Sequence, residues 1–177
     1  MTCAPGYLDV LREYQDAFLA TIPDADPAAP VPWCGDWTVA ELVLHLARVH
    51  HWAASRARSE PEVPLGDGPF DLAPHYASCA AELRATLDEL DPDKRARTLL
   101  DDGVPEVDRV GTVRFWHRRQ VLETLVHTWD LRRATGLDFD PGPPAWLDCL
   151  DEVATILQPR QVRLGRSPGL AVKVRFD

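Results

Sequence analysis

The stretch Val113–Ala134, VRFWHRRQVLETLVHTWDLRRA, carries apolar residues at the spacing of an amphipathic helix and ends just before Gly136, a residue that commonly terminates helices. Within it, Glu123 and His127 are four residues apart. Side chains at positions i and i+4 of a helix lie on one face, one above the other. The stretch therefore predicts a long helix in which a carboxylate and an imidazole point at the same spot.

The same periodicity predicts further helices on both sides of this one. They cover residues 7–22, about 38–60, 73–90 and 145–157. Asp36 or Thr38 is expected to cap the second of them, with Glu41 completing a capping box if Thr38 is the cap. Segments rich in proline and glycine separate the helices, and residues 91–112 form a long connection. Four to five helices in one short chain predict an all-α bundle.

The last residues follow a different pattern. Residues 170–176, LAVKVRF, alternate apolar and polar side chains, which is typical of a half-buried strand. A single strand is not stable alone. We expect it to pair with the 101–112 segment, with another chain, or with sequence beyond this one.

Composition excludes several classes of protein. The 177 residues carry a net charge of −9, from 19 basic and 28 acidic side chains, which argues against a nucleic-acid binder or a polybasic membrane partner. No run approaches the roughly 18 apolar residues that a membrane span requires. The four cysteines are far apart and form no C-x-x-C pair. We expect free thiols in a reducing cytoplasm, and disulfides in a secreted protein are the less favoured alternative.

The helix containing Glu123 has an unusual polar stripe. Its members are Trp116, Gln120, Glu123, His127, Asp130 and Ala134. Polar residues at helical spacing usually face solvent, but Trp116 within this stripe predicts an interior position. A buried carboxylate beside an imidazole needs a partner, either a divalent cation or a Glu–His ion pair. We favour the cation.

His45, in the second predicted helix, shares a face with apolar residues and is the expected third ligand. His50 and His51 point away from His45 and are expected at the surface. His75 and His117 have no partner at a suitable spacing. One carboxylate and two imidazoles suit Zn²⁺, although Fe²⁺, Ni²⁺ and Mn²⁺ accept the same ligands.

Two neighbouring side chains are candidates for supporting the site. Asp130 or Gln120, one turn from the ligands, is expected to orient a ligand histidine. Three protein ligands leave a position open for water or a thiolate.

Cys34, between two tryptophans, is either a turn residue, which we favour, or a reactive thiol near a helix N-terminus.

Two segments together resemble the mycothiol-dependent maleylpyruvate isomerase family. They are Trp33–Arg48, WCGDWTVAELVLHLAR, and Arg119–Leu131, RQVLETLVHTWDL. The resemblance spans residues 7–160 and implies a DinB-like four-helix bundle, followed here by an extra C-terminal helix. Carried over by position, the family's zinc ligands are His45, Glu123 and His127. Residues 161–177 resemble the start of a C-terminal α/β domain that longer members carry.

The resemblance also implies a function. Members use mycothiol, an actinobacterial thiol, whose sulfur binds the metal and then adds to an unsaturated substrate. We therefore expect a cis–trans isomerase or S-transferase, with a small-molecule thiol and substrate as partners, and we consider a homodimer as well. The alternatives are a non-catalytic, metal-stabilised module that acts as a sensor or binds a partner, and a metal-free bundle with a buried ion pair.

Overall fold

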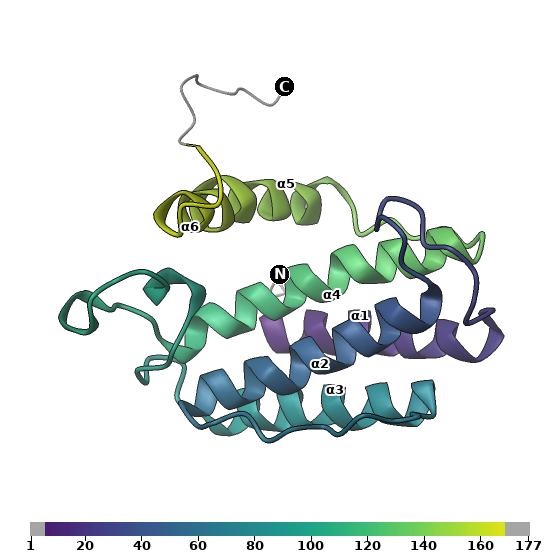
Figure 1. The fold of residues 1–177 in the computed structure, drawn as a ribbon, viewed down its shortest axis with the longest axis horizontal. Coiled ribbons are helices and arrows are strands. Elements are labelled where there is room, and N and C mark those ends of the chain that lie inside the picture. Colours follow the sequence, from purple (N-terminus) through teal and green to yellow (C-terminus); the bar gives the residue numbers. More distant parts are fainter. Residues whose placement is uncertain (1–5, 169–177) are drawn as a thin grey trace, which may run out of the picture.

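A computed structural model describes residues 6–168, and helices dominate this part of the chain (Figure 1). No strand occurs in the described range; extended pairing is limited to isolated bridges between Pro30 and Thr38 and between Arg95 and Thr112. The all-α, DinB-like bundle predicted from the sequence is confirmed. The strand predicted at 170–176 lies outside the described residues.

Four long helices form the bundle. They are α1 (Tyr7–Thr21), α2 (Val39–Arg58), α3 (Leu72–Glu89) and α4 (Val113–Ala134). Helix α1 packs mainly on α4, and α2 packs mainly on α3 while also touching α4, so the four lie side by side (Figure 1). Each of their boundaries lies within two residues of the sequence prediction. None of the described helices is both long and apolar enough to cross a membrane.

Local chemistry sets the ends of α2 and α4. The Thr38 hydroxyl accepts a hydrogen bond from the Glu41 backbone N–H at 3.3 Å, and the Glu41 carboxylate accepts one from the Thr38 N–H at 2.7 Å. This is the predicted capping box, with Thr38 rather than Asp36 as the cap. After α4, Gly136 adopts φ +73°, a conformation that costs glycine little. The Leu137 N–H then bonds back to the Arg132 carbonyl at 2.8 Å.

The bundle core fixes the rotation of α4. Trp116 is fully buried and packs edge-on against Trp52 of α2 at 5.2 Å between ring centroids. Its indole N–H donates to the Arg97 carbonyl at 3.0 Å, which attaches the α3–α4 connection to the core. Because Trp116 and Gln120 point inward, Glu123 and His127 on the same stripe turn toward α2. Trp116, Gln120 and Asp130 of this stripe are buried as predicted, whereas Glu123, His127 and Ala134 are partly buried.

The C-terminal helix is longer than predicted. In place of a single helix over 145–157, α5 (Pro143–Glu152) runs into a π turn, η4 (Val153–Leu157), and then into α6 (Gln158–Arg163). The extension contains Pro159, although proline normally disrupts a helix interior. The wider π turn just before Pro159 shifts the carbonyl that its ring would otherwise meet, so the helix continues. These segments lie alongside α4 (Figure 1).

Candidate metal centre

The structure brings the three predicted ligands together where α2 faces α4. His45 comes from α2, and Glu123 and His127 come from successive turns of α4. One potential ligand atom from each residue lies within 4.8 Å of the other two. The two histidine rings meet nearly at right angles, with 5.1 Å between their centroids.

The separations suit a tetrahedral ion. The Glu123 Oε1 atom lies 3.6 Å from His45 Nε2 and 3.5 Å from His127 Nε2. Ligands about 2.1 Å from a tetrahedral zinc are about 3.4 Å from one another. The two oxygen-to-nitrogen separations are therefore close to the spacing that such an ion requires, and the ligand atoms of all three residues lie within 4.8 Å of one another.

The candidate centre opens to solvent on one side. The His45 side chain is 34% exposed, whereas those of Glu123 and His127 are each 14% exposed. Trp37 packs beside His45, with 4.7 Å between the ring centroids. Two of the candidate ligands are thus mostly buried in the bundle, and the third is partly exposed to solvent.

Asp130 orients His127. Its carboxylate accepts a hydrogen bond from His127 Nδ1 at 3.0 Å, which leaves Nε2 facing Glu123. Burial disfavours the protonated imidazole, but the hydrogen bonds to Asp130 and Glu123 outweigh it and raise the pKa of His127 to about 9. A histidine ligand whose other ring nitrogen donates to a carboxylate is a common arrangement in metal sites.

Arg119 holds the other side of Glu123. The guanidinium donates to Glu123 Oε2, the oxygen that does not face the histidines, and also to Glu152 Oε2 of α5 at 2.5 Å. Burial alone would raise the pKa of Glu123, but the Arg119 charge and the histidine hydrogen bonds hold it well below its usual range. Glu123 is therefore ionised at neutral pH, as a ligand must be.

Sequence reasoning missed the roles of Arg119 and Glu152. Arg119 is four residues before Glu123, so the i,i+4 rule could have identified that ion pair. Glu152 is on a different helix, and no local pattern connects it to Arg119.

Gln120 and two neighbouring histidines lie elsewhere than expected. The Gln120 amide oxygen pairs with Nδ1 of His50 at 3.0 Å, and not with a proposed ligand. His50 and His51 were predicted at the surface, but they are 0% and 7% exposed. The prediction was wrong because α3 and α4 cover α2 along more of its circumference than the apolar pattern indicated. Burial lowers the pKa of His50 to about 4, so this ring is neutral.

The buried His51 is part of a separate network. Its Nδ1 contacts the Glu82 carboxylate at 2.6 Å and its Nε2 contacts the Val63 carbonyl at 2.7 Å. Arg58 donates to the other oxygen of Glu82 at 2.6 Å. These bonds attach the α2–α3 connection to both helices.

Cys34 behaves as the turn residue that we favoured. It is partly buried in the loop before α2, beside the Asp130 carboxylate. Burial, together with the neighbouring Asp130 charge, raises the pKa of its thiol to about 11, so it is not a thiolate at neutral pH. Of the cysteines in the described part of the chain, Cys34, Cys79 and Cys149 are all free.

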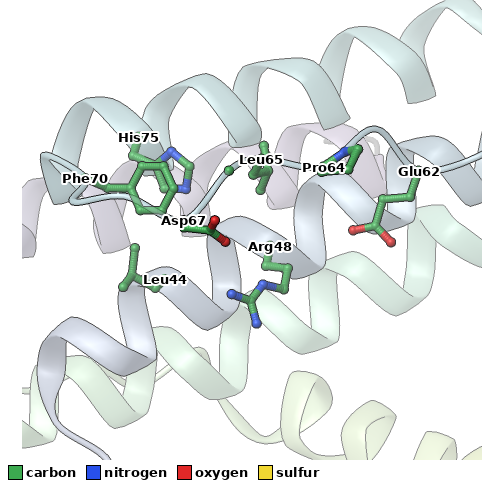
Figure 2. A pocket seen from close by; sticks show the side chains of 9 residues that line it. Leu44, Arg48, Glu62, Pro64, Leu65, Asp67, Phe70 and His75 are labelled. Atoms are coloured by element: carbon green, nitrogen blue, oxygen red, sulfur yellow. The ribbon is translucent and has the colours of Figure 1, made fainter.

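A cavity of about 310 Å³ lies on a neighbouring face of α2, beneath the α2–α3 connection (Figure 2). Its walls include Leu44 and Arg48, which flank His45 along α2, and the stacked rings of Phe70 and His75, 4.0 Å apart. None of the three proposed ligands lines it. The cavity therefore adjoins the helix that carries His45 without being part of the candidate metal centre.

The comparison with protein families gives one match. A family model described as the mycothiol maleylpyruvate isomerase N-terminal domain matches residues 8–132. The matched range includes all three candidate ligands and nearly all of α1–α4, and it ends before α5. No curated protein and no solved structure matches the chain.

Proposed function

This chain belongs to the family of the mycothiol maleylpyruvate isomerase N-terminal domain, and we propose on that basis that it binds one divalent metal through His45, Glu123 and His127 and works with a thiol cofactor. The observation that carries the proposal is the spacing of three suitable ligand atoms, all within 4.8 Å of one another. Zinc is the proposed ion because two imidazoles and one carboxylate form a ligand set that it commonly takes.

The residues around the centre support an open, reactive site. Three protein ligands leave a coordination position free, and the exposure of His45 gives access to it. Zinc bound there would lower the pKa of a water or thiol in the free position. Glu123 is ionised already, and Asp130 directs the Nε2 atom of His127 toward the centre.

We propose mycothiol as the thiol and a small unsaturated or electrophilic molecule as the substrate. In an isomerisation, the thiolate adds to one carbon of a cis double bond, rotation follows about the resulting single bond, and loss of the same thiolate restores the double bond as trans. In an S-transfer, the sulfur stays on the product: in an addition, a C–S bond forms and the neighbouring carbon takes up the proton that the thiol lost, whereas in a substitution the C–S bond replaces the bond to a leaving group, which departs with the electron pair. The assignment of residues 161–177 to the start of an α/β domain remains a prediction.

A non-catalytic role is the second candidate, and one observation favours it. Arg119 already pairs with Glu123, so this buried carboxylate has a counter-charge without any metal. A metal-free bundle, or a metal that only stabilises the fold, is compatible with that ion pair.

Metal content separates these candidates. We would strip the protein with a chelator, reload it with zinc, remove excess ion and measure zinc per chain. The parent and a His75→Ala control should each retain about one equivalent, and His45→Ala/His127→Ala should retain none. Equal, near-zero content in all three proteins would eliminate the metal centre.

Thiol binding then separates an enzyme from a structural metal site. We would replace zinc by Co²⁺ and titrate mycothiol while recording the absorption spectrum. A new sulfur-to-cobalt charge-transfer band is expected if the thiolate enters the open position. A spectrum that stays unchanged at saturating thiol would refute the thiol-dependent reaction while leaving the metal site intact.

A further inference from the structure

We infer that Glu152 of α5 is a positioning residue for the proposed metal centre, acting through Arg119 on the ligand Glu123. The inference rests on the proposed metal-binding function. It concerns a residue beyond the matched family range of 8–132. It means that the C-terminal helix is part of the centre and not merely an addition to the bundle.

The first step is that the two carboxylate oxygens of Glu123 have different partners. Oε1 faces His45 and His127, at 3.6 Å and 3.5 Å from their Nε2 atoms. Oε2 accepts from Arg119. A carboxylate held in this way offers one oxygen to an ion, because the other is already committed to the guanidinium.

The second step is what keeps Arg119 from taking both oxygens. Arginine readily binds a carboxylate through two parallel hydrogen bonds. A guanidinium that bound Glu123 in this way would draw Oε1 away from the histidines. Here the second nitrogen of Arg119 is engaged by Glu152 at 2.5 Å, so the guanidinium bridges two carboxylates.

The third step is burial. The side chain of Glu152 is 3% exposed and that of Arg119 is 15% exposed. Solvent and salt screen such a pair weakly, and neither side chain has room to move freely. The bridge therefore fixes the rotation of the Glu123 carboxylate across the interface between α4 and α5.

The same two helices supply a matched control. Arg118, the residue before Arg119, donates to Asp148 of α5 at 2.8 Å. The Arg118–Asp148 pair joins α4 to α5 as the Arg119–Glu152 pair does, but it is more exposed, and Arg118 bonds to residues of α5 and not to Glu123. Arg118 also donates to Asp151 of α5 at 2.7 Å. Removing Asp148 therefore weakens this second link between α4 and α5 without disturbing the bridge to the candidate ligand.

The experiment compares metal affinity in the full chain of the parent, Glu152→Ala, Glu152→Gln and Asp148→Ala. The dissociation constant for Zn²⁺ is measured by competition with a chromogenic chelator, and the ligand-field spectrum of the Co²⁺ form reports the coordination of Glu123. Circular dichroism of the metal-free proteins establishes that each is folded. Substitutions of groups that orient a metal ligand typically weaken affinity by about 10–100-fold.

We expect Glu152→Ala to weaken Zn²⁺ binding by about tenfold or more and to change the Co²⁺ spectrum. Glu152→Gln, which keeps an acceptor of the same length, should recover much of the loss, and Asp148→Ala should bind as the parent does. Unchanged affinity in Glu152→Ala would overturn the inference. So would an equal loss in Asp148→Ala, because docking of α5 would then explain the effect. A parent that binds no metal would refute the proposed function itself, a result that these variants cannot imitate.

Discussion

His51 allows a sharp test of the buried network that joins α2, α3 and their connection. Its Nδ1 faces a Glu82 carboxylate oxygen and its Nε2 faces the Val63 carbonyl oxygen, and both partners only accept hydrogen bonds. Each ring nitrogen must therefore carry a proton, so the structure requires the imidazolium form. Burial opposes this charge, but the bonds to Glu82 and Val63 outweigh it and raise the pKa of His51 above its usual 6.5.

The perturbation is His51→Gln, whose side chain can keep only one of the two bonds. Hydrogen bonds that involve a charged group contribute about 1.5–3 kcal/mol, and neutral ones contribute about 0.5–1.5 kcal/mol. The Glu82 side chain is 32% exposed, which favours the lower part of these ranges. Losing one charged bond and weakening the other should therefore cost about 2 kcal/mol in the free energy of unfolding at pH 6.

The pH dependence follows from the sign of the pKa shift. Because the folded pKa is raised, the contribution of His51 is fully present below about pH 6.5 and is lost as the pH rises through the folded value. We would measure urea unfolding of the parent and of His51→Gln at intervals between about pH 5.5 and 9. The difference in unfolding free energy should shrink as the pH increases. A difference that stays constant or grows would refute the imidazolium assignment.

Two further outcomes are expected. In the metal-free protein, Asp130→Asn should lower the pKa of His127 from about 9 toward 6.5, because the charge that favours the imidazolium is removed. NMR titration of the ring protons measures this pKa. An unchanged value would show that Asp130 does not control His127. Trp116→Ala should reduce the free energy of unfolding by about 3–5 kcal/mol, because it empties a fully buried position and leaves the Arg97 carbonyl without its donor. A loss below about 1 kcal/mol in urea unfolding would contradict the packing described for α4.

Much of the fold could be read from the sequence because its signals are local. The periodicity of apolar residues located all four bundle helices, and the spacing of Thr38 and Glu41 identified the cap of α2. The helix predicted over 145–157 is also present, but it continues to Arg163 through a π turn that precedes Pro159.

Some features of the candidate site also follow from local spacing in the sequence, whereas others depend on how the helices pack. The i,i+4 spacing of Glu123 and His127, and the i,i+3 spacing of His127 and Asp130, follow from helical geometry and were available from the sequence. The choice of His45 over its neighbours depended on its apolar face and on the family resemblance. That His50 and His51 are buried depends on how far α3 and α4 wrap around α2, which no pattern within α2 reveals.

By itself, the sequence therefore determined which segments are helices and which side chains share a face of each, because these properties depend on the 3.6-residue period and on caps within a few residues. Only the tertiary structure decided which faces meet. It placed His45 opposite Glu123, joined Arg119 to Glu152 across 33 positions of sequence, and paired His51 with Glu82 of another helix. These contacts depend on the rotation and crossing of whole helices, which are set by packing of the entire core and not by any short stretch of chain.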